Sequence, residues 1–135
     1  MPALDIDVLY AHLKPSDWLK SAAGGVVSRV ENGEMAAYTS AISVVELELV
    51  SRRDFDRRFS QQVLGRLRAI RGLELRDLTE AVLETAASVR SRADLGIFDA
   101  IHAATALKGD RAIVSTDAAF DRVVGLKRVD PRGLP

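Results

Sequence analysis

Stretches with helical spacing of apolar residues alternate with short apolar stretches along the whole 135-residue chain. We expect strands at about 3–5, 35–39, 73–78, 111–115 and 127–129, and helices at 8–13, 16–30, 43–50, 54–70, 79–92, 97–107 and 117–123. Helices between short buried strands are typical of α/β domains, because parallel strands need long crossover connections. The sequence therefore predicts an α/β/α sandwich around a central, mostly parallel sheet of four to five strands.

Composition narrows the class of protein further. The length suits one compact domain covering residues 1–135, and hydrophobic (47%) and charged (28%) fractions are ordinary for globular proteins. Cysteine is absent, which excludes disulfides, thiolate metal sites and a cysteine nucleophile. No apolar run approaches the roughly 20 residues of a membrane helix, and the N-terminus lacks the pattern of a signal peptide. We therefore expect a cytoplasmic protein that does not enter a membrane.

Four acidic residues fall near the ends of expected strands or the starts of expected helices. Asp5 closes the first strand and Asp117 follows the strand at 111–115, while Glu46 and Asp99 lie early in helices. Ligands of open parallel sheets bind outside the carboxyl ends of the strands. We therefore expect these four carboxylates to face one binding edge.

The segments around these acids resemble, in order, the four motifs of PIN domains. They are Asp5-Ile6-Asp7-Val8-Leu9, Ser43-Val44-Val45-Glu46-Leu47, Phe98-Asp99-Ala100-Ile101-His102-Ala103-Ala104-Thr105-Ala106 and Ile113-Val114-Ser115-Thr116-Asp117-Ala118-Ala119-Phe120. Ile6 and Asp7 depart from the family pattern, which commonly has Thr or Ser and then Asn or Ser. The first change removes a hydroxyl beside Asp5, and the second adds a carboxylate. The chain thus resembles a PIN-domain ribonuclease of the VapC toxin type.

This resemblance implies an activity and a set of partners. The activity is metal-dependent hydrolysis of RNA phosphodiester bonds by an endoribonuclease that leaves 5′-phosphate and 3′-hydroxyl ends. The residues that would catalyse it and bind the metal are Asp5, Glu46, Asp99 and Asp117. The implied partners are RNA, a VapB-like antitoxin that docks beside the active site, and a second copy of the chain. Residues 44–47 and 55–70 would line the antitoxin groove.

Carboxylates at one edge suit divalent cations. Mg²⁺ and Mn²⁺ prefer oxygen ligands, and a bound ion lowers the pKa of water and stabilises charge at a phosphate. Two like charges about 4 Å apart repel by roughly 4 kcal/mol at an effective dielectric constant near 20. We therefore expect one or two Mg²⁺ (or Mn²⁺) ions at this site.

Simpler roles are open for each acid. Asp5 or Asp7 can begin the helix at Val8, Asp117 can cap the helix at Ala118, Asp99 can complement a helix dipole, and Glu46 can be an exposed helix residue.

Other residues have a weaker link to the site. Ser115 can orient Asp117 or a water, and Asp7, Asp94 and Asp121 are further metal candidates. For Asp94 we favour capping of the next helix through Gly96, and for Asp121 a solvated role is equally open. His12 and His102 lack ligand spacing, so we interpret both as surface or core residues.

Arginines are concentrated between residues 52 and 76, a segment that contains eight arginines and only three acidic residues. Arg52, Arg53, Arg57 and Arg58 are the candidates for binding the RNA backbone, although a solvated helix face with ion pairs is an alternative. Three aromatic residues lie at apolar positions of the expected helices, and we expect them to pack rather than to stack on bases. They are Trp18, Phe55 and Phe59.

Other functions remain as alternatives. A stand-alone PIN nuclease of RNA processing or decay would share the chemistry without an antitoxin, and a non-catalytic PIN scaffold would bind RNA or protein only. A phosphoacceptor receiver domain also carries strand-end acids, but it needs a lysine after its last strand, and none of the four lysines matches that position.

Overall fold

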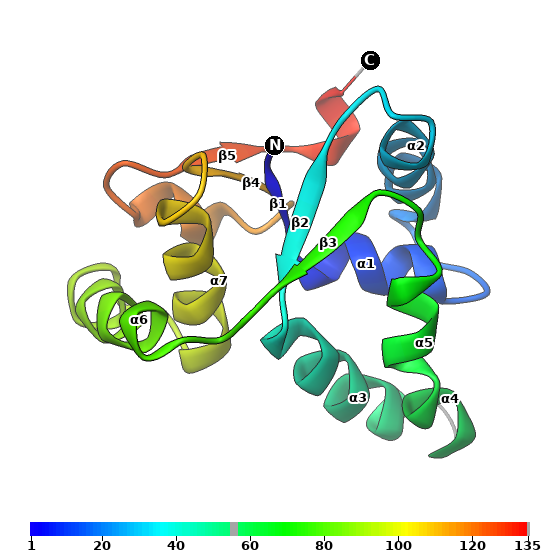
Figure 1. Cartoon of the computed structure of the whole chain (residues 1–135), viewed down its shortest axis with the longest axis horizontal. Helices are drawn as coiled ribbons and strands as arrows, with labels where there is room; N and C mark the ends of the chain where they lie inside the picture. The colour runs from blue at the N-terminus through cyan, green and yellow to red at the C-terminus, as the bar shows by residue number, and fades with distance from the viewer. Residues whose placement is uncertain (55–56, 135) are drawn as a thin grey trace.

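The computed structural model describes residues 1–54 and 57–134 and contains one parallel sheet (Figure 1). The sheet has five strands in the order β3-β2-β1-β4-β5. The strands are β1 (Ala3–Leu4), β2 (Ala37–Ser40), β3 (Leu73–Arg76), β4 (Ala112–Val114) and β5 (Lys127–Val129). The α/β class and the strand number are confirmed, and all strand pairs of the described residues are parallel.

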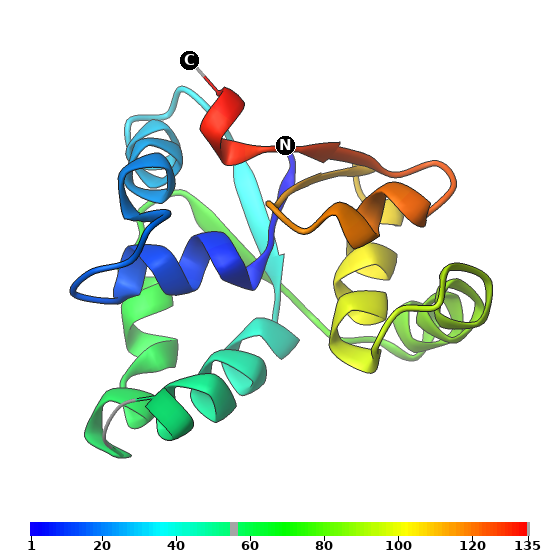
Figure 2. The ribbon, with the colours of Figure 1, turned by 180° about the vertical axis from the view of Figure 1, so that it is seen from behind.

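Helices connect these strands and cover both faces of the sheet (Figures 1 and 2). The helices are α1 (Ile6–Leu13), α2 (Lys20–Glu31), α3 (Ile42–Asp54), α4 (Arg57–Gln61), α5 (Val63–Arg68), α6 (Glu80–Ala93) and α7 (Ile97–Leu107). Two 3-10 helices, η1 (Ala118–Arg122) and η2 (Pro131–Gly133), follow β4 and β5.

Alternation along the strands divides the apolar residues into two cores. Leu4 and Val114 pack with α1, α2 and α5, whereas Ala3, Tyr38 and Ile113 pack with α6 and α7. Successive residues of a strand point to opposite faces, so strands buried on both sides read as continuous apolar runs. The result is the predicted three-layer α/β/α sandwich.

The strand order places a switch point at the middle of the sheet. The chain passes from β1 outward through β2 to β3, and then returns to β4 and β5 on the other side of β1. Helices leave the carboxyl ends of β1 and β4 in opposite directions at such a point, and a crevice opens between them. Asp5 follows β1 and Ser115 follows β4, so both lie at this crevice.

The expected helix at 54–70 is wrong in its boundaries. Helix α3 continues to Asp54, and α4 and α5 are separate. The amide of Gln62 donates to the carbonyl of Phe59 at 3.0 Å, a tighter turn that interrupts the α-helical pattern. This break lets Val63 and Leu67 enter the core. Phe59 packs against that core as expected, whereas Phe55 lies outside the described residues.

The expected helix at 16–30 begins later, and one of its apolar residues is exposed. Helix α2 starts at Lys20, and the Asp17 carboxylate accepts a hydrogen bond from the Leu19 amide at 2.9 Å. Leu19 is buried at 2% exposure while Trp18 is 72% exposed, so the expectation that Trp18 packs is wrong. Within the described ranges, no helix is long and apolar enough to cross a membrane.

Candidate active site

Asp5 links the end of β1 to the start of α1. Its extended backbone and its side chain, which accepts from the Ile6 amide at 2.8 Å, make it the N-cap of α1. The helix therefore starts two residues earlier than expected, and the simpler capping role of Asp5 is real. The second carboxylate oxygen accepts a hydrogen bond from the Ser115 hydroxyl at 2.7 Å. A hydroxyl thus contacts Asp5 even though Ile6 supplies none.

The carboxyl of Asp5 is buried at 3% exposure, which makes its charge costly. The pKa of Asp5 is raised from 3.8 to about 7, chiefly by burial and also by the negative charge of Asp7, against the lowering effect of His102 and Ser115. A buried carboxyl with a strongly raised pKa in a cleft is typical of functional sites.

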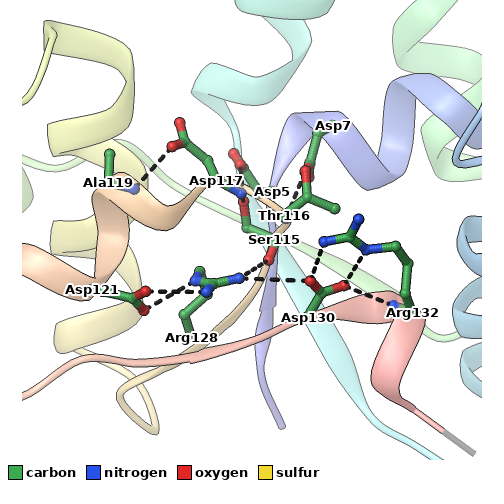
Figure 3. Close-up of polar contacts among 10 residues, drawn as sticks. All are labelled: Asp5, Asp7, Ser115, Thr116, Asp117, Ala119, Asp121, Arg128, Asp130 and Arg132. Carbon is green, nitrogen blue, oxygen red and sulfur yellow. Dashed lines mark hydrogen bonds and ion pairs between the residues drawn. The ribbon is translucent and has the colours of Figure 1, made fainter.

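Ser115 joins the two central strands at their carboxyl ends. Its hydroxyl donates to Asp5 and accepts from the Asp117 amide at 3.0 Å. It therefore orients Asp5 as well as the backbone of Asp117, which is a wider role than the one expected from sequence (Figure 3).

Asp7 holds the loop after β4. One carboxylate oxygen of Asp7 accepts from both the amide (2.8 Å) and the hydroxyl (2.6 Å) of Thr116. The side chain thereby fixes Thr116 next to Asp117 (Figure 3). Asp7 lies in the first turn of α1, beyond the end of β1, and it is near enough for its charge to raise the pKa of Asp5.

Asp117 is exposed and caps η1. Its carboxylate accepts a hydrogen bond from the Ala119 amide at 2.9 Å, which is the simpler role considered for it. This bond uses Oδ1 and leaves Oδ2 without a hydrogen bond from the described residues.

Glu46 contacts His102, for which the sequence predicts only a surface or core position. The Nε2 atom of His102 lies 2.6 Å from Oε1 of Glu46, and the two side chains are 2% and 14% exposed. Burial alone would lower the pKa of His102, but the hydrogen bond to Glu46 and the charges of Asp5 and Asp99 raise it. His102 is therefore part of this cluster. Its spacing of three residues from Asp99, on one helix face, is the signal that could have identified it.

Asp99 lies half-buried in the first turn of α7 and connects the cluster electrostatically. Burial raises the pKa of Asp99, and the negative charges of Asp117 and then Glu46 raise it further. Asp117 and Glu46 therefore each repel Asp99. Asp99 in turn contributes, with Asp5 and Glu46, to the raised pKa of His102. The structure thus gathers Asp5, Glu46, Asp99 and Asp117 at one edge.

The cluster is open rather than closed around one point. Among residues 1–54 and 57–134, no three His, Asp or Glu side chains converge tightly enough to form a ready-made metal site. The carboxylate of Glu46 is hydrogen-bonded to His102, and that of Asp117 accepts a hydrogen bond from the Ala119 amide. Carboxylates that repel each other are expected to take separate hydrogen-bond partners. Their hard oxygen atoms nevertheless suit Mg²⁺ or Mn²⁺.

Two of the weaker candidates for binding metal, Asp94 and Asp121, lie apart from this cluster. Asp94 is the C-cap of α6 with a left-handed backbone, and the N-cap of α7 is Gly96 without a side-chain bond, so the expected capping of α7 by Asp94 is wrong. Asp121 forms two hydrogen bonds of 3.0 Å to Arg128. Figure 3 shows Asp121 directed toward Arg128, whose guanidinium also donates to the Ser115 carbonyl at 3.2 Å.

The four candidate arginines lie at the far end of α3 and at the start of α4. All four are exposed, and Arg53 pairs with Asp54 at 3.3 Å. Arg52 and Arg57 line a hollow of about 330 Å³. Arg52 lies six residues beyond Glu46, which is about 9 Å along the helix axis. Arg52 and Arg53 are therefore on the same helix as Glu46, toward its carboxyl end.

Solved structures share this fold, but no curated protein matches the sequence. VapC20 of Mycobacterium tuberculosis, described as a Sarcin-Ricin loop cleaving toxin, is 16% identical, covers 93% of this chain and 98% of its own, and has a TM-score of 0.74. VapBC2 of Rickettsia felis, bound to a promoter DNA fragment, is 14% identical, covers 94% of this chain and 96% of its own, and has a TM-score of 0.73. FitAcB of Neisseria gonorrhoeae is 22% identical, covers 99% of this chain and 100% of its own, and has a TM-score of 0.72. These likenesses concern the fold.

The sequence itself is matched by a family model. The match covers residues 8–126, which is most of the chain, and the family is described as the PIN domain. Three of the four acids, Glu46, Asp99 and Asp117, lie inside the matched range, and Asp5 lies three residues before its start. The chain belongs to the PIN-domain family.

Proposed function

We propose that this PIN domain is a divalent-metal-dependent endoribonuclease that hydrolyses RNA phosphodiester bonds, and that it is the toxin of a toxin–antitoxin pair. The observation that carries the proposal is the gathering of Asp5, Glu46, Asp99 and Asp117 at the switch point, with raised pKa values at Asp5 and Asp99. Such a concentration of negative charge destabilises the fold unless a cation or protons relieve it.

The same four carboxylates would hold Mg²⁺ or Mn²⁺, in one or two ions. When bound, the ion supplies an activated water and stabilises charge at the phosphate. The protein's own part is positional. Ser115 holds Asp5 from β4, and Asp7 holds the loop that carries Asp117. His102 orients Glu46 from the neighbouring helix. These contacts fix the acids on rigid elements.

RNA would reach the cleft along its positive side. Arg52, Arg53, Arg57 and Arg58 are exposed, and phosphate contacts of this kind fix the position of a nucleic acid without reading its sequence. The net charge of the whole chain is zero, so this local concentration matters more than the total.

The protein partners would use exposed apolar residues near the cleft. Val45 and Leu49 are 47% and 52% exposed and lie one turn apart on α3, on either side of Glu46 in sequence. An amphipathic antitoxin segment could bury them. Leu83 and Ile97 are exposed on α6 and α7 and could serve a homodimer. VapBC2 and FitAcB are complexes by name, which supports an antitoxin partner for this chain.

Cleavage of end-labelled RNA tests the proposal. The wild type should cleave with Mg²⁺ or Mn²⁺ and not in EDTA, and Asp5→Asn and Asp99→Asn should each lower the rate about 100-fold or more. Asp121→Asn is the matched control, because Asp121 is an acid at the same edge that pairs with Arg128 instead. Circular dichroism verifies that each variant is folded.

The alternatives give different outcomes. RNA binding without cleavage at saturating metal would indicate a non-catalytic scaffold, and equal cleavage by all variants would refute the assigned site. A small open reading frame beside the gene, whose product binds the protein and blocks cleavage, separates the toxin from a stand-alone PIN nuclease.

A further inference from the structure

Trp18 is the only tryptophan of the chain and is 72% exposed. A large aromatic side chain in water forgoes the burial that normally stabilises it. The next residue, Leu19, is 2% exposed and already makes the core contact at this turn. Trp18 is therefore free to contact a molecule other than its own chain.

A hollow of about 440 Å³ lies beside the indole, a size within the range of small-ligand pockets. Helix α2 contributes Ala22, Gly25 and Arg29 to the lining of this hollow, and η2 contributes Pro131 and Arg132. Apolar atoms and an aromatic ring thus share the hollow with two guanidinium groups. This combination suits a flat ring attached to an anionic group.

Arg132 is held in place at the rim of the hollow. Its Nε atom donates to Asp130 at 2.9 Å, and its guanidinium lies 5.5 Å from the centre of the Trp18 ring. Asp130 is only 31% exposed and fixes the orientation of the arginine, whereas the Arg132 side chain remains 54% exposed. The charge is therefore oriented in advance and still accessible to a ligand.

The hollow lies at the same edge of the sheet as the acidic cleft. Asp130 follows β5 as Ser115 follows β4, and the two strands are parallel neighbours. Asp130, and more weakly the charge of Asp7, raise the pKa of Arg132. Figure 3 shows Arg132 at the end of the sheet on the same side as Asp7 and Thr116.

We propose that this hollow binds one nucleotide of the single-stranded RNA that flanks the bond to be cut. The base stacks on Trp18, and Arg132 and Arg29 hold its phosphate. This inference rests on the proposed ribonuclease function and extends its substrate site beyond the acidic cleft. Stacking accepts every base, so the hollow contributes affinity and direction of the strand rather than sequence preference. Two guanidinium groups at the rim favour an anionic ligand, so a nucleotide is preferred over an uncharged protein segment.

Tryptophan emission reports on this hollow alone, because the chain has no other tryptophan. An eight-nucleotide oligouridylate, titrated in EDTA so that it is not cleaved, should quench the emission of the wild-type protein. Anisotropy of the same oligonucleotide with a fluorescent label then gives the affinity of each variant. Trp18→Leu should weaken binding roughly 5- to 100-fold, and Trp18→Phe should retain most of it.

Charge variants supply the matched comparison. Arg132→Gln should reduce the slope of log affinity against log salt by about one. Arg90→Gln removes another exposed arginine, from α6 on the opposite face of the sheet, and should bind as the wild type does. In cleavage assays with Mg²⁺, Trp18→Leu should raise KM and leave kcat nearly unchanged.

Two results overturn the proposal while the ribonuclease function stands. In the first, the wild type cleaves RNA, but its emission is unaffected and Trp18→Leu binds normally. In the second, emission changes with protein concentration and not with RNA, so that the hollow is a contact between protein chains. Failure of the wild type to cleave or bind any RNA in Mg²⁺ instead refutes the ribonuclease proposal, and the nucleotide subsite with it.

Discussion

Replacing Asp5 by asparagine should stabilise the metal-free protein at alkaline pH while it removes RNA cleavage. The folded-state pKa of Asp5 is about 7, above the ordinary 3.8, chiefly because the carboxyl is buried. The folded protein therefore holds this proton more tightly than the unfolded chain. The free energy of unfolding consequently falls as the pH rises from about 4 to about 7, and the loss is complete above pH 7.

The size of the effect follows from the shift. About three pKa units correspond to about 4 kcal/mol at 1.36 kcal/mol each. Asparagine keeps an oxygen for the Ile6 amide but must reverse the hydrogen bond to Ser115, which costs about 1 kcal/mol. We therefore expect Asp5→Asn to raise the free energy of unfolding by about 2–4 kcal/mol at pH 8.

Urea unfolding followed by circular dichroism in EDTA measures this difference. Most of it should disappear at pH 4, where the folded wild type is neutral at Asp5. A variant less stable than the wild type at pH 8, or an equal offset at both pH values, would refute the reasoning. The expected combination of higher stability and no cleavage is the trade-off found where charges are gathered for function.

Three further substitutions probe the supporting contacts. Ser115→Ala removes the hydroxyl that joins Asp5 to the Asp117 amide, so it should lower the free energy of unfolding by about 1–3 kcal/mol in urea titrations, and unchanged stability would contradict this. His102→Leu should slow cleavage about 10- to 100-fold by releasing Glu46, with partial recovery in His102→Gln; a normal rate in the leucine variant would exclude a positioning role. Asp121→Asn should leave the cleavage rate unchanged, and a large loss would bring Asp121 into the site.

The fold could be predicted from the sequence because the strands β1, β2 and β4 in the middle of the sheet are largely buried. Apolar stretches such as 112–114 and helical spacing between them are local signals, and all five expected strands are present. The break at Gln62 and the exposure of Trp18 depend on which residues reach the core. Leu19 and Val63 fill the core at these two points. The helical spacing of apolar residues alone does not predict which of two neighbouring residues is buried.

The candidate site could be predicted in part. Strand ends meet at one edge of a parallel sheet, which places Asp5 near the loop of Asp117 without any knowledge of distances. The direction of Glu46 could not be deduced, because its partner His102 is 56 residues away. The bond between Asp7 and Thr116 spans 109 residues and depends on where β1 ends. Such pairings arise from tertiary packing.

The central claim is that the gathered carboxylates form one site for a divalent cation, and thermal unfolding with and without Mn²⁺ tests it most directly. At about 100 times the dissociation constant, the ion should stabilise the wild type by about 2.7 kcal/mol. Asp99→Asn should lose most of this gain, and Asp121→Asn should keep it. An unchanged melting temperature for the wild type at saturating Mn²⁺, or an equal increase in Asp99→Asn, would contradict the account.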